Sequence, residues 1–104
     1  MNTSSLINQV NESLATLGAG PFVTLNSSDS ENGAVVTGKL DGRILRIEFI
    51  EEGSGDHPEK GHRVDVVDDA SGENLGTGRG DSTFADAISS HNWGGTIEAL
   101  GRLG

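Results

Sequence analysis

The dipeptide Asp41-Gly42 constrains the fold more than any other feature of the sequence. It separates two apolar-rich runs, GAVVTGKL over residues 33–40 and RILRIEFI over residues 43–50. An Asp-Gly pair suits a two-residue turn because both turn residues need a positive φ, and such a turn fixes how its two strands pair. We therefore predict a β-hairpin in which Leu40 faces Arg43 and Ala34 faces Phe49.

This register gives the hairpin two different faces, because successive side chains of a strand point to opposite sides. One face is apolar and is expected to cover the core; it carries Ala34, Val36, Leu40, Leu45, Ile47 and Phe49. The other face mixes polar and apolar residues and is expected to meet solvent; it carries Val35, Thr37, Lys39, Ile44, Arg46 and Glu48, with Thr37 opposite Arg46.

Two stretches have the periodicity of amphipathic helices. The first covers residues 4–17, with Thr3, Ser4 or Ser5 as its N-cap and Gly18 as a left-handed stop; its apolar stripe is Leu6, Ile7, Val10, Leu14 and Leu17. The second is expected to begin after a cap at Asp81 or Ser82 and to end near His91, because Gly94-Gly95 follows; its inner residues are Phe84, Ala87, Ile88 and His91. Residues 96–100 indicate at most one marginal further turn.

The remaining segments are predicted to be strands and loops. We expect short strands at residues 22–25 and 62–68, a return strand around Leu75, and loops at 26–33 and 51–61. Three glycines at alternate positions then suggest a flexible approach to the second helix; they are Gly76, Gly78 and Gly80.

These elements predict one α+β domain over residues 1–104. We expect an antiparallel sheet of three to five strands with two helices packed on one face, in the order α-β-β-β-β-α. The predicted core consists of Leu6, Val10, Leu14, Leu17, Val36, Leu45, Ile47, Phe49, Val64, Val66, Phe84 and Ile88.

The composition excludes several classes of protein. The chain has 104 residues with 16 Asp or Glu, seven Lys or Arg and a formal net charge of −9, which opposes non-specific binding to nucleic acid or anionic lipid. The absence of Cys excludes disulfides and thiolate sites. No apolar run is long enough for a membrane-spanning helix, and the first residues lack the features of a secretory signal, so we expect a cytoplasmic protein.

The segment LGTGRGDS, over residues 75–82, leads into a predicted helix that contains Ala85 and Ala87. This Gly-rich turn and the order helix, strands, helix resemble the double-stranded-RNA-binding domain family. The resemblance implies that family's α+β fold, in which lysines at the start of the second helix contact phosphates. Asp81 and Asp86 lie there in this sequence, and because phosphate contacts require Lys or Arg, nucleic acid is not an expected ligand.

Motifs for catalysis or metal binding are incomplete. GTGRGD is not followed by the Lys and Ser or Thr of a phosphate-binding loop, and no Ser lies in a G-x-S-x-G elbow. The loop residues Asp56, His57, Glu59 and His62 are of metal-ligating types, but their spacing matches no standard zinc pattern. We therefore predict that the chain is not an enzyme and has no cofactor and no metal.

Four residues are candidates for binding, namely Trp93, His91, Arg79 and Arg46. Trp93 is the single Trp; it either anchors a partner, because Trp is enriched at interface hot spots, or closes the core with its indole N–H bonded to a carbonyl. His91 lies two residues before it. Arg46 lies on the solvent face of the hairpin, and Arg79 lies near a helix start that could hold an anion.

The acidity and the lack of a catalytic motif favour a small acidic, non-catalytic protein-interaction module. We expect a protein partner that contacts the exposed sheet face and the region of Trp93, and a homodimer is an alternative. Two other functions stay open. One is an acidic nucleic-acid mimic that inhibits a nucleic-acid-binding protein, and the other is a degenerate double-stranded-RNA-binding-like domain.

Overall fold

The computed structural model describes residues 2–51 and 61–103. Their order along the chain is α1 (Thr3–Thr16), β1 (Val23–Ser30), β2 (Gly33–Leu40), β3 (Arg43–Glu51), β4 (His62–Asp68), β5 (Asn74–Gly80), α2 (Phe84–Ser90) and α3 (Trp93–Leu103). The five strands form one antiparallel sheet in the order β1-β2-β3-β4-β5. The predicted α+β class and antiparallel sheet are therefore confirmed, with five strands.

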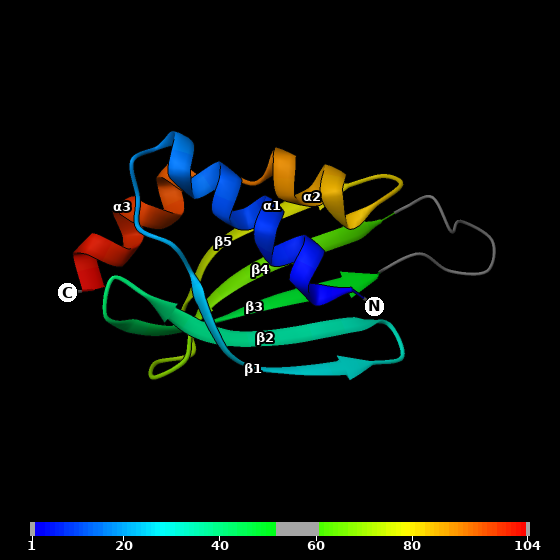
Figure 1. Ribbon diagram of the computed structural model, residues 1–104, viewed down its shortest axis with the longest axis horizontal. Helices are drawn as coiled ribbons and strands as arrows, with labels where there is room; N and C mark the ends of the chain where they lie inside the picture. The colour runs from blue at the N-terminus through cyan, green and yellow to red at the C-terminus, as the bar shows by residue number, and fades with distance from the viewer. Residues whose placement is uncertain (1, 52–60, 104) are drawn as a thin grey trace.

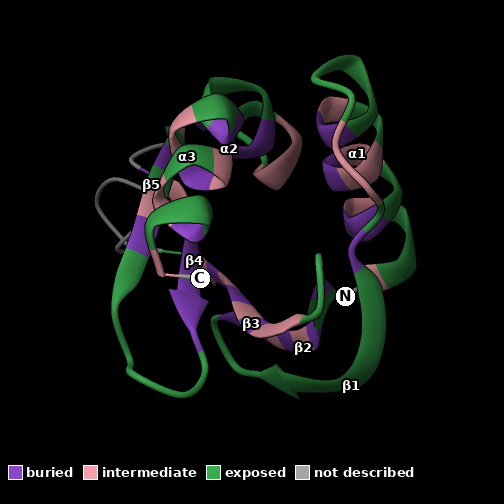
Figure 2. Ribbon diagram, turned by 90° about the vertical axis from the view of Figure 1, so that its left-hand side faces the viewer, coloured by how far each residue is buried: buried purple, intermediate pink, exposed green. Residues whose placement is uncertain are grey.

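The helices lie on one face of a curved sheet (Figure 1). α1 lies over the β1 and β2 side, and α2 and α3 lie over β5, with the core between them and the sheet (Figure 2). Both predicted helices are present as α1 and α2, and the described residues add a third, α3, where the sequence indicated at most one marginal turn.

The hairpin of β2 and β3 has the predicted register. Leu40 pairs with Arg43 and Ala34 with Phe49. The turn residues Asp41 and Gly42 have φ of 52° and 81°, the left-handed values that the turn requires. All six predicted inward residues of this hairpin are buried.

The core joins the sheet to all three helices. Its buried apolar residues include, besides the predicted ones, Ile7, Phe22, Leu40, Leu75, Ala87, Trp93 and Leu100. Leu6 and Phe84 pack against this core but are only partly buried. Leu17 was expected inside and is 51% exposed, because α1 ends at Thr16 and the chain reverses at Gly18, whose φ is 73°.

Both predicted N-caps are displaced by one or more residues. Asn2 caps α1, with its Oδ1 accepting the Ser5 N–H at 3.1 Å, in place of Thr3, Ser4 or Ser5. Thr83 caps α2, with its Oγ1 accepting the Asp86 N–H at 3.1 Å, in place of Asp81 or Ser82. In each segment several neighbouring residues can cap a helix, so composition alone does not select one.

The predicted loop at residues 26–33 is wrong. β1 extends to Ser30, and the turn contains only Glu31 and Asn32. All eight residues of β1 are exposed, so its polar side chains stay in contact with water and no free energy of desolvation is lost. Pairing with β2 is what keeps this segment extended.

The glycines of β5 are a packing surface and not a flexible approach. A Cβ on Gly78 would lie 2.4 Å from the carbonyl oxygen of Ala87, and one on Gly80 would lie 2.4 Å from the Ala87 nitrogen. Glycine at alternate positions therefore lets α2 lie directly on the strand backbone.

Gly94-Gly95 does not end a helix but lies in the first turn of α3. Asn92 starts this turn, because its Oδ1 accepts the Gly95 N–H at 3.0 Å. Burial of Trp93, Thr96 and Leu100 then outweighs the poor helix propensity of glycine.

Candidate interaction surface

The side of the sheet opposite the helices is a broad surface that we call the outer face. The register of β2 to β5 directs a common set of side chains to it, namely Val35, Thr37, Lys39, Ile44, Arg46, Glu48, Ile50, Arg63, Asp65, Val67, Thr77 and Arg79. None of the helices in the described residues lies over this face (Figure 2). The face that the sequence predicted to meet solvent is therefore the one without a covering helix.

Basic side chains gather on the outer face of this acidic protein. Four of the six Lys and Arg residues that the structure describes lie there, namely Lys39, Arg46, Arg63 and Arg79. The strands contribute two carboxylates to the same face, Glu48 and Asp65, which lie directly opposite each other. The outer face thus differs in charge from the rest of the molecule.

Ion pairs organise the charges of this surface. Arg63 Nε lies 3.0 Å from Asp65 Oδ2, and Arg46 Nε lies 3.6 Å from Asp69 Oδ1 at the end of β4. Asp65 Oδ1 also accepts the Thr77 hydroxyl at 2.7 Å, and the Asp65 side chain is only 11% exposed. The result is a surface of alternating charge, held across β3, β4 and β5, and not a continuous basic stripe.

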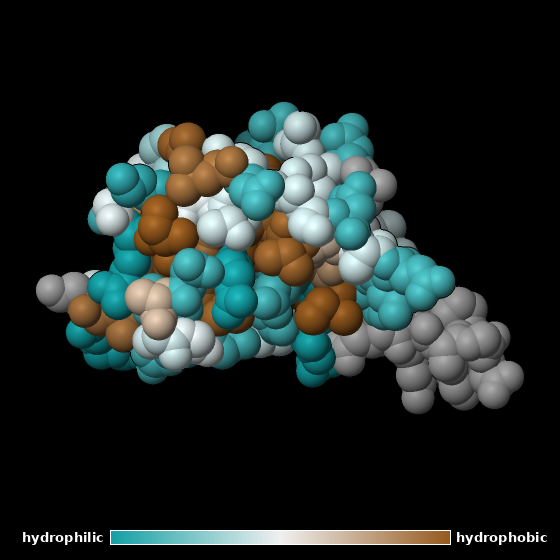
Figure 3. Space-filling view, turned by 90° about the horizontal axis from the view of Figure 1, so that it is seen from below, coloured by the Kyte–Doolittle hydropathy of each residue, from teal (hydrophilic) through white to brown (hydrophobic). Residues whose placement is uncertain are grey.

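Aliphatic side chains separate the charges. Val35, Ile44 and Ile50 are partly exposed, whereas Val67 is buried. Seen from below the sheet, apolar patches lie between hydrophilic side chains (Figure 3). The outer face therefore offers both apolar contacts and charges held in ion pairs.

The two other predicted binding residues lie on the helix side. Trp93 is 6% exposed, and its indole N–H donates to the Ile88 carbonyl oxygen at 2.9 Å. The interpretation that Trp93 closes the core is therefore confirmed. His91 is also buried, with its ring centroid 4.0 Å from that of Trp93. The structure thus brings Arg46 and Arg79 to one face and separates them from His91 and Trp93.

His91 links α2, α3 and β5 through one hydroxyl group. Its Nε2 lies 2.7 Å from Thr96 Oγ1, and that hydroxyl donates to the Leu75 carbonyl oxygen at 3.1 Å. With the Thr96 hydroxyl donating to Leu75, the neutral His91 tautomer that completes this chain of hydrogen bonds is the one with its hydrogen on Nε2. Burial lowers the pKa of His91 from 6.5 to about 4, so the ring is uncharged at neutral pH.

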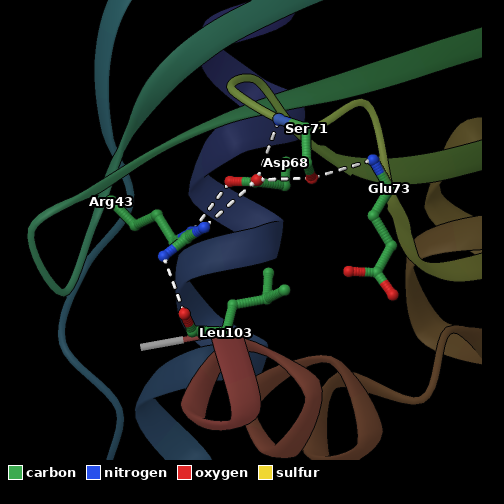
Figure 4. Close-up of polar contacts among 5 residues, drawn as sticks. All are labelled: Arg43, Asp68, Ser71, Glu73 and Leu103. Carbon is green, nitrogen blue, oxygen red and sulfur yellow. Dashed lines mark hydrogen bonds and ion pairs between the residues drawn. The ribbon is translucent and has the colours of Figure 1, made fainter.

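A buried carboxylate that sequence reasoning missed fixes one end of the sheet (Figure 4). Asp68 has a fully buried side chain and accepts from Arg43 Nε at 2.8 Å and from the Ser71 hydroxyl at 2.7 Å. Arg43 Nη1 also donates to the Leu103 carbonyl oxygen in the last turn of α3, at 3.4 Å. The Arg43 and Ser71 hydrogen bonds hold the pKa of Asp68 at about 2, so it is ionised. We call Arg43, Asp68 and Ser71 the Asp68 cluster.

Two surface hollows lie at opposite ends of the fold, and the second reaches Arg79 of the outer face. One of about 420 Å³ lies between the β2–β3 turn and α3 and is lined by Asp41, Gly42, Arg43, Ile97, Leu100 and Gly101. The other, of about 380 Å³, is polar and includes Arg79 together with Asp81 and Asp86. These two carboxylates oppose the binding of an anion beside Arg79.

The described residues contain no group of three or more His, Asp or Glu side chains arranged to hold a metal ion. Asp56, His57 and Glu59 of the candidate loop lie outside the described residues, and His62 packs its ring against Phe84. None of the described helices has the length and apolar character needed to cross a membrane.

A scan with protein-family models, a search of curated proteins and a search of solved structures each returned no match to this chain.

Proposed function

We propose that this chain is a small acidic, non-catalytic protein-interaction module that binds a partner protein through the outer face. The observation that carries the proposal is the concentration of Lys39, Arg46, Arg63 and Arg79 on the face without a covering helix. Their position between aliphatic side chains supports a partner surface that combines carboxylates with an apolar centre.

The charge arrangement favours this function over nucleic-acid binding. Arg46 and Arg63 each have a carboxylate within 4 Å, so a phosphate would compete with an intramolecular partner. Duplex binding depends on cations that can neutralise phosphates, and these arginines are already partly neutralised. The double-stranded-RNA-binding alternative therefore receives no support from this face.

The carboxylates of the described residues are distributed over several elements, whereas a nucleic-acid mimic would need them in a single array. Those of the described residues lie on helices, in turns at both ends of the sheet and on strands; examples are Glu12 on α1, Asp41 in the β2–β3 turn and Glu98 on α3. A mimic requires negative charge repeated along one surface at the spacing of phosphates. This distribution supports the interaction module as the leading proposal, with a cytoplasmic location as the accompanying expectation.

Matched charge reversals test the proposal. The chain is used as bait in an extract of its source organism, with chemical crosslinking and quantitative mass spectrometry. Arg46→Glu reverses a charge on the outer face, and Arg102→Glu reverses one on α3, where the Arg102 side chain is 71% exposed. We expect Arg46→Glu to lower recovery of the partner about tenfold, which corresponds to about 1.4 kcal/mol, and Arg102→Glu to leave it unchanged. Equal recovery by both variants would contradict the proposal.

A further inference from the structure

β1 is an open sheet edge with unusual properties. All eight of its residues are exposed, and its one extensive contact is with β2 (Figure 2). The opposite edge strand, β5, is covered on its inner face by α2 and α3. Proteins usually protect an open edge with Lys, Pro or a covering element, because unpaired backbone groups there can pair with another strand. β1 contains neither Lys nor Pro; its one irregularity is a register shift between Thr24 and Asn26, which leaves residues 26–30 regular and open.

Most of this edge strand lies in a long stretch of the sequence without charged residues. No charged residue occurs from Ser13 to Ser28, although 22% of the chain is charged. The large apolar side chains that are most exposed in the described residues all lie in this stretch, namely Leu17 at 51%, Val23 at 55% and Leu25 at 60%. An acidic protein therefore has a neutral, partly apolar segment beside an open strand edge.

The strand register tells which backbone groups point to this edge. A two-residue turn closes on a hydrogen-bonded pair, so Leu40 and Arg43 bond each other, and the alternation continues along β2. Val36 therefore directs its N–H to β3 and not to β1. Its partner in β1, Ser27, is then in a pair without hydrogen bonds and directs its own N–H to the open edge. Ser28, which pairs with Val35, directs its N–H to β2.

We propose that β1 binds β1 of a second copy of this chain in antiparallel orientation, so that two five-stranded sheets join across a two-fold axis. A second copy is a suitable partner because β1 carries almost no charge, so two β1 strands can approach each other. Contact through the acidic surfaces of two copies, each with a net charge of −9, would be opposed by repulsion. A basic partner, by contrast, would be attracted to the acidic surfaces and not to this neutral one.

The pairing keeps the one charge of β1 apart from its counterpart. Residues 26–30 pair regularly with β2, and with the axis at Ser27 each Asp29 lies two residues beyond the axis, beside the register irregularity at Leu25 of the other copy. The two Asp29 positions are then about 13 Å apart along the strands, at about 3.3 Å per residue. This separation exceeds the Debye length of about 8 Å at physiological ionic strength, so their repulsion is weak. The surface differs from the outer face, and the inference does not depend on the proposed function.

Two variants of the same residue test the inference. Ser27→Pro removes the N–H that points to the open edge and leaves the β1–β2 bonds in place, whereas Ser27→Ala loses the same hydroxyl and keeps the N–H. Sedimentation equilibrium should show a mass approaching twice 10.8 kDa at high concentration for the natural chain and for Ser27→Ala. Ser27→Pro should stay monomeric while keeping a cooperative thermal transition. A natural chain that stays monomeric up to about 1 mM, the millimolar limit of weak association, overturns the inference.

Hydrogen exchange gives a readout that needs no variant. At dilution the Ser27 amide should exchange rapidly and the Ser28 amide slowly, because only the latter bonds β2 in the monomer. At concentrations that give a dimer, Ser27 should become protected while Ser28 changes little. A dimer in which the Ser27 amide still exchanges rapidly would use another surface and would overturn the inference. Added NaCl should strengthen the dimer, since it screens the repulsion between two acidic copies.

Discussion

At the scale of single residues, two buried polar side chains have shifted pKa values, so we expect each to make the stability of the protein depend on pH. Asp68 is ionised and has donors from β3 and from the β4–β5 turn, whereas His91 is neutral and joins α2 to α3 and β5. Each is stabilised in one protonation state, so changing that state weakens the contacts of several elements at once.

The Asp68 cluster predicts a large effect for a small substitution. Asp68→Asn keeps the size of the side chain but replaces a carboxylate that accepts from Arg43 and Ser71, which leaves the Arg43 guanidinium without its counter-charge. We expect the thermal midpoint to fall by several degrees. Asp69→Asn is the control, because Asp69 is 46% exposed and makes one ion pair of 3.6 Å, and it should change the midpoint little. Equal effects would mean that the cluster does not hold this end of the sheet together.

His91 predicts a loss of stability in mild acid. Its pKa is lowered from 6.5 to about 4, so the unfolded chain takes up the proton first; the contribution of neutral His91 is complete above pH 6.5 and is lost as the pH falls toward 4. The expected decrease in the free energy of unfolding is about 2–3 kcal/mol. Urea unfolding followed by Trp93 fluorescence at pH 4.5 and pH 7 measures it.

The variant His91→Gln keeps an N–H donor for Thr96 and cannot be protonated in this range. It should be less dependent on pH between 4 and 6.5 than the natural chain, whatever its absolute stability. An unchanged pH dependence would assign the effect to other groups. Below this range a second loss is expected, because the pKa of Asp68 is lowered from 3.8 to about 2 and its stabilisation disappears as the pH falls through about 2.

At the scale of elements, glycine has opposite effects in a strand and in a helix of the same molecule. In β5 the inward glycines allow α2 to lie directly on the backbone, whereas Gly101 on α3 has open space where a Cβ would be. The space around the Cα, and not the residue type, therefore decides what an added methyl group does.

Two substitutions to Ala should change stability in opposite directions. Gly78→Ala would place a Cβ 2.4 Å from the Ala87 carbonyl oxygen, so we expect a loss of about 1–3 kcal/mol as α2 is displaced. Gly101→Ala should gain about 0.5–1 kcal/mol, because Ala has the better helix propensity and meets nothing there. Urea denaturation measures both. A neutral result for Gly78→Ala would show that α2 moves at little cost.

These elements also show how far the sequence alone could lead. The hairpin of β2 and β3 was predictable residue by residue, because a two-residue turn and alternating apolar side chains both act locally. β1 and α3 were not, because pairing to β2 overrides the polar composition of residues 26–30, and burial of Trp93 overrides two helix glycines. The alternating glycines of β5 could have indicated the packing of α2, because glycine inside a strand often marks the close approach of another backbone.

The candidate site was predictable in part. The outer face follows from the hairpin register, which placed Arg46 and Lys39 correctly on the side away from the core. Arg63 and Arg79 lie near them because β4 pairs with β5, and no local pattern in the sequence predicts that pairing. The Asp68 cluster likewise joins Arg43 to a residue 25 positions away.

At the scale of the whole molecule, charge is distributed unevenly between the two sides of the sheet. The outer face holds most of the described cations and only two carboxylates, Glu48 and Asp65, so its formal charge is positive and the rest of the chain carries more than the whole net charge of −9. Repulsion among the carboxylates of the rest of the chain opposes the compact state, and the ion pairs of Asp68 and Asp65 favour it. Salt screens exposed charges more than buried ones, so it should weaken the repulsion more than the Arg43–Asp68 pair.

Stability should therefore increase with ionic strength. We expect the midpoint of urea unfolding to rise when NaCl is increased from about 0.02 to 0.5 M, over which the Debye length falls severalfold. The measurement belongs at a protein concentration where the chain is monomeric, because association through β1 would also stabilise the folded state. Sucrose at matched osmolality is the control, since it strengthens burial without screening charge. A midpoint that falls with NaCl would mean that attraction within the ion pairs exceeds the repulsion among the carboxylates, and that the acidity does not destabilise this fold.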